Sequence, residues 1–150
     1  MWDKKDLYIL ELLQKNARMT ASEVASEVGL SVPAAAERIK KLVDQNLITG
    51  FYARVNAKKL GFDLTAFIAV VSSSSDHYQD IINQSEAHPS VLECHSVTGE
   101  GSHLLKVRIH NSTELEKLLL NIQAWPGVIR THTMVVLSTY KECNALNLTQ

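Results

Sequence analysis

Two helix-start signals on either side of a single glycine constrain the first part of the chain most strongly. Thr20 and Glu23 form a capping-box pattern, in which the hydroxyl and the carboxylate each satisfy a free backbone amide of the first helical turn. Gly29 permits a sharp, left-handed turn after the helix that this box begins. Ser31 can cap the next helix, and Pro33 falls in its first turn, where a missing N–H costs little. The pattern therefore predicts two helices joined by a tight turn.

A helical apolar stripe precedes these two helices. Leu7, Leu10 and Leu13 recur at helical spacing with polar residues between them. Three short helices with a glycine turn between the last two make a helix-turn-helix. We predict this domain over residues 1–50, and a turn and short extended segment after the third helix give it a winged-helix-like character. Residues 51–62 then read as the linker to a second domain.

The hydrophobic pattern changes beyond residue 62. Residues 64–71 form an apolar run that is typical of a buried strand. A helix, two strands, a helix and a strand are predicted to follow at residues 76–88, 91–98, 104–109, 111–124 and 128–140. The order βαββαβ is the ferredoxin-like arrangement, an antiparallel sheet with helices on one face. We therefore predict an α+β protein whose second domain, residues 63–150, is ferredoxin-like.

The run at residues 64–71 is apolar on both sides of the expected strand. Helices on one face of the sheet would cover only half of these side chains. A second copy of the chain is the simplest cover for the other half, because most soluble oligomers are symmetric assemblies of identical chains. We therefore predict a homo-oligomer that is at least a dimer.

Charge is distributed unevenly along the chain, although the net charge is only -1. Residues 1–62 hold 10 Lys and Arg against 7 Asp and Glu, and residues 63–150 hold 5 against 9. This asymmetry favours an anion-binding first half, with chance as the alternative. Cys94 and Cys143 are far apart, and no apolar run reaches the length of about 18 residues that a bilayer span needs. We expect a reduced, cytoplasmic protein without a disulfide.

The third predicted helix has a small and basic outward face. The positions expected to face the core are Val32, Ala36, Ile39 and Val43. The positions left on the outside are Pro33, Ala34, Glu37, Arg38, Lys40 and Lys41. A recognition helix enters the DNA major groove by its N-terminal end, where bulk would clash with the walls of the duplex. Small side chains at Ala34 and Ala35 permit that approach.

The cations of this helix suit different parts of a DNA duplex. Arg38 is expected to reach a base edge, most readily guanine, through two parallel hydrogen bonds. Lys40, Lys41 and Arg18 are suited to phosphates. The alternative is a solvated helix face, which normally carries such charges. The glycine turn, the cap, the small start of the helix and the basic first half together favour DNA binding.

The loop Thr98-Gly-Glu-Gly-Ser-His103 has two glycines, which let backbone amides approach a ligand. A plain hairpin turn is the alternative. The loop is no dinucleotide signature, because it joins two predicted strands instead of opening a helix. Cys94, His95 and His103 match no zinc spacing, and Ser102 next to His103 lacks an orienting acid. We expect no metal, no cofactor and no catalytic residues.

Motifs along nearly the whole chain resemble those of one family. The segments are Asp6-Leu-Tyr-Ile-Leu10, Asn16-Ala-Arg18, Val28-Gly-Leu-Ser31, Glu37-Arg38-Ile39, Leu47-Ile48-Thr-Gly50, Leu60-Gly61, Cys94-His-Ser-Val-Thr-Gly99, Leu104-Leu-Lys-Val107 and Pro126-Gly-Val-Ile-Arg-Thr131. Their order and spacing resemble the Lrp/AsnC, or feast-famine, transcription regulators. The resemblance implies a non-enzymatic, sequence-specific DNA-binding protein. It also implies dimers that assemble into octamers of four dimers, and small effectors, often amino acids, that bind between subunits in the second domain.

The resemblance also implies site residues. Those expected at DNA are Arg18, Ser31, Pro33, Ala34, Ala35, Glu37, Arg38, Lys40 and Lys41. Those expected at the effector are Thr98, Gly99, Glu100, Gly101, Ser102, His103, Leu104, Thr131 and Thr133. One departure concerns the effector: the family usually has an acidic, an aromatic and an acidic residue after Thr-Gly, where this chain has Glu100-Gly-Ser-His103. The identity of the effector, and even its existence, stays open.

Two alternatives share this architecture. One is an effector-independent protein that wraps DNA, which the altered loop keeps open. The other is an enzyme similar to sirohaem decarboxylases, which would need a deep basic pocket and no DNA-reading helix. The cations Arg38, Lys40 and Lys41 favour the regulator over the enzyme.

Overall fold

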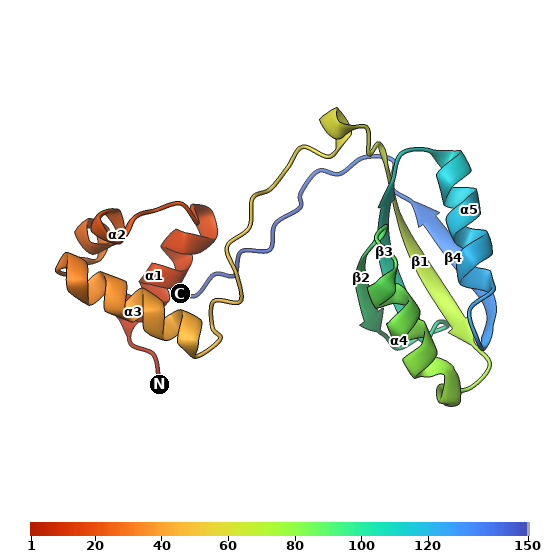
Figure 1. Cartoon of the computed structure of the whole chain (residues 1–150), viewed down its shortest axis with the longest axis horizontal. Coiled ribbons are helices and arrows are strands. Elements are labelled where there is room, and N and C mark those ends of the chain that lie inside the picture. Colours follow the sequence, from red (N-terminus) through yellow and green to blue (C-terminus); the bar gives the residue numbers. More distant parts are fainter. Residues whose placement is uncertain (150) are drawn as a thin grey trace. The chain divides into compact units, whose positions relative to one another are not determined.

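The computed structural model describes residues 1–149 and divides into two compact units (Figure 1). One unit contains Met1–Arg54 together with the chain from Lys141 onward, and the other is Val55–Tyr140. The sequence-based boundaries placed residues 63–150 in the second domain. The structure differs, because the last residues pack with the first unit.

The first unit is the predicted helix-turn-helix. Its helices are α1 (Lys4–Lys15), α2 (Ala21–Val28) and α3 (Val32–Asp44). The Thr20 hydroxyl accepts a hydrogen bond from the backbone N–H of Glu23, and the Glu23 carboxylate accepts one from that of Thr20, which confirms the capping box. Gly29 ends α2 with φ 67°, the left-handed conformation that glycine adopts without strain. The Ser31 hydroxyl accepts from the N–H of Ala34 and caps α3.

The buried side of α3 differs from the prediction by about one residue. The side chains buried in the first unit are Ile9, Leu13, Val24, Ala25, Val28, Ala35 and Leu42. Val32 and Val43, which were expected to face inward, are 46% and 40% exposed, and Ala36 is also exposed. The inward stripe is instead Ala35 and Leu42 with half-buried Ile39, because Leu42 buries more apolar surface than Val43.

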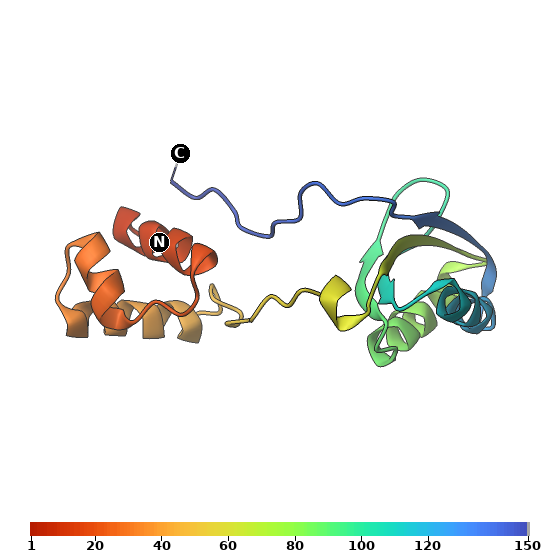
Figure 2. The same ribbon diagram turned by 90° about the horizontal axis from the view of Figure 1, so that it is seen from above.

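The second unit is the predicted βαββαβ arrangement. Its elements are β1 (Leu64–Ser72), α4 (Tyr78–Ala87), β2 (Val91–Ser96), β3 (His103–Ile109), α5 (Ser112–Gln123) and β4 (Val128–Val135). The strands form an antiparallel sheet in the order β2-β3-β1-β4, and both helices lie on the same face of it (Figure 2). The last strand ends at Val135, short of the predicted residue 140. Within residues 1–149, no helix is long and apolar enough to cross a membrane.

The two faces of the sheet differ in what covers them. Ala66, Ile68 and Val70 of β1 point to the helix face and are fully buried against α4 and α5. The alternate residues Phe67 and Ala69 point to the opposite, open face and are only half-buried. The structure therefore agrees with the prediction that β1 is apolar on both of its sides. The helices α4 and α5 cover only one of these sides.

Candidate functional site

The side of α3 that faces away from the helical core carries small and polar side chains, and most of them are exposed to solvent. Pro33, Glu37, Lys40 and Lys41 are exposed, and Ala34 is half-buried. Ala35, which was expected at DNA, has no exposed surface and belongs to the helical core, so that expectation is wrong. The neighbouring Ala36 is exposed instead and supplies the small side chain on this face.

The two lysines of α3 are placed differently. Lys40 Nζ lies 2.5 Å from Oδ2 of Asp44, one helical turn further on. This hydrogen bond raises the pKa of Lys40, and the pair is solvent-exposed, so it holds the ammonium group only weakly in place. Lys41 is exposed on the same helix. Arg18, which precedes α2, is exposed as well.

Arg38 does not project freely from α3. Its Nη1 lies 2.7 Å from Oδ2 of Asp3 and 2.8 Å from Oδ1 of Asp6. Asp3 and Asp6 are also the two partners of the capping box that begins α1. The hydrogen bonds that Arg38 donates to these carboxylates raise the pKa of Arg38. The pKa of Asp3 is lowered first by the backbone N–H of Asp6 and then by Arg38. The ion pairs therefore tie the middle of α3 to the start of α1.

The loop between β2 and β3 presents one open glycine and one packed glycine. Gly99 has φ 105° and faces open space. A Cβ on Gly101 would lie 3.2 Å from the carbonyl oxygen of Val70 and 3.3 Å from Cβ of Ala69. The next residue donates its backbone N–H to the same Val70 carbonyl over 2.9 Å. Gly101 therefore lets the loop pack closely on β1, whereas Gly99 and its neighbour Glu100 remain exposed.

His103 lies in the sheet and not in the surface loop where it was expected. It is the first residue of β3, is 1% exposed, and makes an edge contact with the Tyr78 ring at 5.0 Å between centroids. Its Nδ1 lies 2.8 Å from the Ser102 hydroxyl. Burial lowers the pKa of His103. Its side chain is therefore not available to an effector on the protein surface, and the Ser102 hydroxyl is already engaged.

Thr131 and Thr133 lie on β4, opposite Val70 and Ile68 of β1. They therefore point to the helix face, and Thr131 Oγ1 accepts a hydrogen bond from the Gln123 side chain of α5. Because β1 lies between β4 and β3, two strand spacings, about 10 Å, separate these threonines from the strand that follows the loop. One protomer does not bring the two groups together.

Metal-ligating side chains are scattered. In residues 1–149 no group of three or more His, Cys, Asp or Glu is arranged to hold a metal ion, and Cys94 and Cys143 are free thiols.

Comparisons with known proteins cover both units. Residues 3–49 match a family model described as winged helix-turn-helix DNA-binding, and residues 65–146 match the Lrp/AsnC ligand binding domain. The HTH-type transcriptional regulator FL11 of Pyrococcus abyssi is 35% identical over 96% of this chain and 95% of its own length. LrpA of Mycobacterium tuberculosis is 33% identical over 92% of this chain and 91% of its own length.

Solved structures agree with these matches. A transcriptional regulator of Neisseria meningitidis, in complex with L-methionine, superposes with a TM-score of 0.94 at 29% identity over 99% of this chain and 97% of that chain. The feast or famine regulatory protein of M. tuberculosis, complexed with L-methionine, superposes with a TM-score of 0.90 at 32% identity over 97% of this chain and 98% of that chain.

Proposed function

Because this chain belongs to the Lrp/AsnC family of DNA-binding transcription regulators, we propose that it is a cytoplasmic, non-enzymatic regulator that reads double-stranded DNA with the exposed face of α3. The observation that carries this proposal is a capped helix whose exposed side combines small residues with cations. Ser31 caps α3, Pro33 and Ala36 keep its face small, and Lys40 and Lys41 follow within the next turn. A helix of this kind fits the major groove end-on.

The roles along α3 differ from those expected from sequence. We propose that Ala36 and Glu37 face base edges, where alanine suits a thymine methyl group and glutamate accepts from cytosine N4. Lys40, Lys41 and Arg18 contact phosphates. Arg38 acts mainly as a positioning residue, because Asp3 and Asp6 already engage its guanidinium.

The effector is an amino acid or a close analogue, bound at an interface between subunits. Two relatives with known structures are complexed with L-methionine. In this chain Gly99 offers an unobstructed backbone N–H for a carboxylate, and exposed Glu100 offers an acceptor for an ammonium group. Thr98 precedes them in the loop. Thr131 and Thr133 would come from a different subunit, because in one protomer β1 separates them from the loop.

The chain acts as a homodimer, and four dimers form an octamer. The apolar side chains on the open face of β1 support this assembly, because a second copy would remove them from water. Two recognition helices related by a two-fold axis would read half-sites about one helical turn apart, or a multiple of it.

The test compares Lys41→Ala with Lys117→Ala, a lysine of the second unit, in DNA binding by fluorescence anisotropy. DNA selected by the full-length protein and random DNA serve as ligands, over a range of salt concentrations. Lys41→Ala should weaken binding to both and lower the slope of log affinity against log salt by about 0.9, as expected for one lost phosphate contact. Equal binding by both variants would contradict the proposed role of α3.

A further inference from the structure

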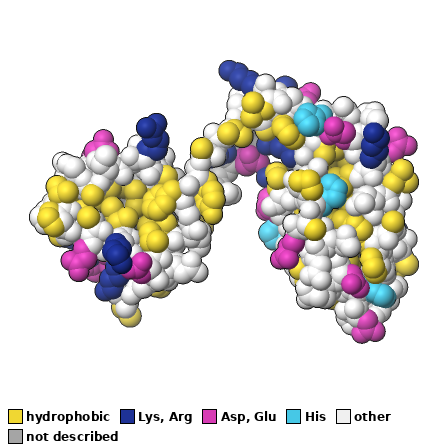
Figure 3. Space-filling model, viewed as in Figure 1, with side chains coloured by type: hydrophobic (Ala, Val, Ile, Leu, Met, Phe, Trp, Pro, Cys, Tyr) yellow, Lys and Arg dark blue, Asp and Glu magenta, His cyan; other side chains and the backbone are white. Residues whose placement is uncertain are grey.

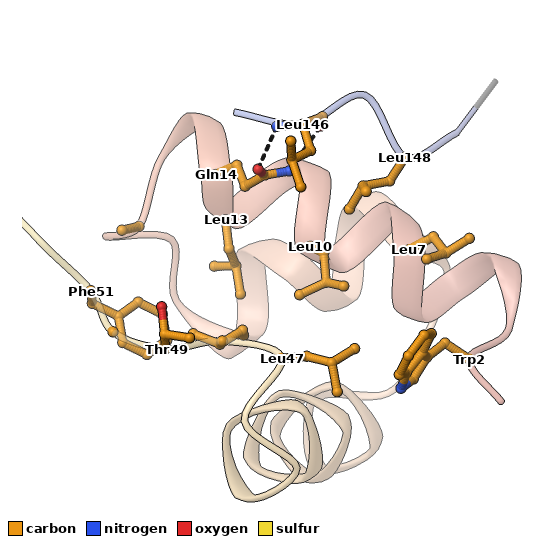
Figure 4. A pocket seen from close by; sticks show the side chains of 13 residues that line it. Trp2, Leu7, Leu10, Leu13, Gln14, Leu47, Thr49, Phe51, Leu146 and Leu148 are labelled. Atoms are coloured by element: carbon orange, nitrogen blue, oxygen red, sulfur yellow. Dashed lines mark hydrogen bonds between the residues drawn. The ribbon is translucent and has the colours of Figure 1, made fainter. Parts of the chain in front are cut away.

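Residues 146–149 lie beside α1. The side-chain amide of Gln14 accepts the backbone N–H of Leu146 at 2.7 Å and donates to the carbonyl oxygen of the same residue at 3.0 Å (Figure 4). Both backbone groups of one residue are thus satisfied by one side chain, as a neighbouring strand would satisfy them. This recognition depends on backbone atoms and not on the side chain of Leu146.

Glu11, one turn earlier on α1, holds the residues that follow. Its Oε1 accepts the N–H of Leu148 at 2.8 Å and the N–H of Thr149 at 2.9 Å. Its Oε2 accepts the hydroxyl of Thr149 at 2.6 Å. A carboxylate that receives three donors from two consecutive residues is a specific clamp for an extended chain, because charge-assisted hydrogen bonds are stronger than neutral ones.

Apolar side chains complete the contact. A cavity of about 380 Å³ is bounded by α1, by Trp2, by the segment from Leu47 to Phe51, and by Leu146 and Leu148. We call this cavity, with its rim residues Glu11 and Gln14, the α1 groove. Leu10 of α1 points toward Leu47, and the C-terminal leucines Leu146 and Leu148 lie beside α1 (Figure 4). Hydrophobic side chains are also numerous on the visible surface of the first unit (Figure 3).

We propose that the α1 groove is a docking site for an extended peptide and that its occupant is the chain's own C-terminal segment, residues 145–149. The segment is tethered nearby as well, because Arg54 Nη2 donates to the carbonyl oxygen of Glu142 at 3.1 Å. The contacts are mostly solvent-exposed, and the free energy gained from these hydrogen bonds and from the half-buried Leu148 only slightly exceeds the entropy lost in ordering five residues. The docking is therefore reversible.

Docking has a consequence for DNA binding, which rests on the proposed role of α3. The N-terminal end of α1 holds Arg38 of α3 through Asp3 and Asp6, and the next turns of the same helix hold the C-terminal segment. A docked segment braces α1 and, through it, the orientation of α3.

The test measures amide hydrogen exchange and DNA affinity in full-length variants. Glu11→Ala removes the clamp, and Glu27→Ala on α2 removes an exposed carboxylate and changes the net charge equally. We expect Glu11→Ala to raise exchange at Leu148 and Thr149 by about tenfold or more, while Glu27→Ala leaves it unchanged. We also expect DNA affinity to be about fivefold lower for Glu11→Ala than for Glu27→Ala.

A second pair of variants guards against a local folding defect at Glu11. Leu148→Asp places a charge among the apolar side chains that line the groove, and Leu137→Asp places one at a side chain that is 95% exposed. Only Leu148→Asp should repeat the loss of protection and affinity. Unchanged exchange in both groove variants would overturn the docking site. Increased exchange with DNA affinity equal to that of the controls would overturn the bracing role.

One further measurement determines whether the docked segment belongs to the same chain or to a second copy. Protection at Leu148 that is independent of protein concentration is expected for a segment of the same chain. Protection that falls as an oligomer is diluted into monomers would show that a second copy supplies the segment, and it would overturn the assignment.

Discussion

Nη1 of Arg38 lies 2.8 Å from Oδ1 of Asp6, and this contact joins the middle of α3 to the first turn of α1. The Asp6 side chain is only 18% exposed, so the pair is better shielded from water than an ordinary surface ion pair. Asp6 also accepts the backbone N–H of Asp3 in the capping box. The residue that the sequence predicts as a base contact thus helps to hold α3, the proposed recognition helix, in place.

We predict that Arg38→Ala and Asp6→Ala destabilise the first unit through a shared interaction. A double-mutant cycle by urea unfolding should give a coupling energy of about 1 kcal/mol, because the contact disappears with either partner. In DNA binding, a positioning role predicts that Arg38→Ala weakens all sites alike. A loss of about 1–3 kcal/mol confined to one base pair would show instead that Arg38 leaves the carboxylates and contacts a base.

Protection of the C-terminal segment should depend on pH through Glu11. Hydrogen bonds from Thr149 and from the backbone N–H of Leu148 lower the pKa of Glu11 below its usual 4.5. The contribution of the docked segment is therefore complete above pH 4.5 and is lost as pH falls through the lower, docked-state pKa. Exchange at Leu148, measured against Val24 of α2 as an internal control, should show this loss. Equal acid sensitivity at both amides would point to global unfolding instead.

Stability of the second unit should fall in mild acid through His103. Burial lowers the pKa of this side chain below 6.5, so the unfolded chain takes up a proton at higher pH than the folded chain does. Stability is full above pH 6.5 and declines as pH falls through the folded-state pKa. Thermal unfolding between pH 8 and pH 5 should show a smaller decline for His103→Gln than for the parent. If His103→Gln loses as much thermal stability as the parent between pH 8 and pH 5, other titratable groups cause the loss.

The effector response should depend on Glu100. If its carboxylate accepts an ammonium group, Glu100→Gln should raise the amino-acid concentration needed for half-maximal response by about tenfold, since a charge-assisted hydrogen bond becomes a neutral one. Glu116→Gln, on the exposed side of α5, is the matched control. This pair is a better test than a bulky residue at Gly101, which would press on the backbone of β1. Identical responses from both variants would place the ammonium group elsewhere.

Local signals in the sequence predicted most of the elements correctly. The capping box at Thr20, the glycine turn at Gly29 and the Ser31 cap of α3 each depend on residues within one helical turn. The order of strands and helices was also predicted correctly, because hydrophobic periodicity depends only on residues that are close together in the sequence. The end of β4 was placed too late, because an apolar run can leave the sheet and continue as extended chain.

Contacts between residues that are distant in the sequence explain the structural features that were not predicted. Adjacent Leu42 and Val43 fit the inward stripe of α3 almost equally well, and the choice depends on packing against α1 and α2. The role of Arg38 depends on acids 32 and 35 residues away, and docking of the C-terminal segment depends on groups more than 130 residues away. Periodicity carries no information about such pairings. The burial of His103 likewise depends on where β3 begins.

The return of the chain to its first unit at Lys141 makes that unit discontinuous in sequence, with the whole sheet domain as an insertion between its two parts. A gene fragment that stops at Arg54 therefore encodes three helices but leaves the α1 groove open and its apolar side chains in water. Likewise, a protease that cuts only within residues 55–62 removes one covalent connection, and the helices then stay attached only as firmly as the C-terminal segment is docked. The strength of that attachment in the cut protein is a direct measure of how tightly the two ends of the polypeptide hold each other.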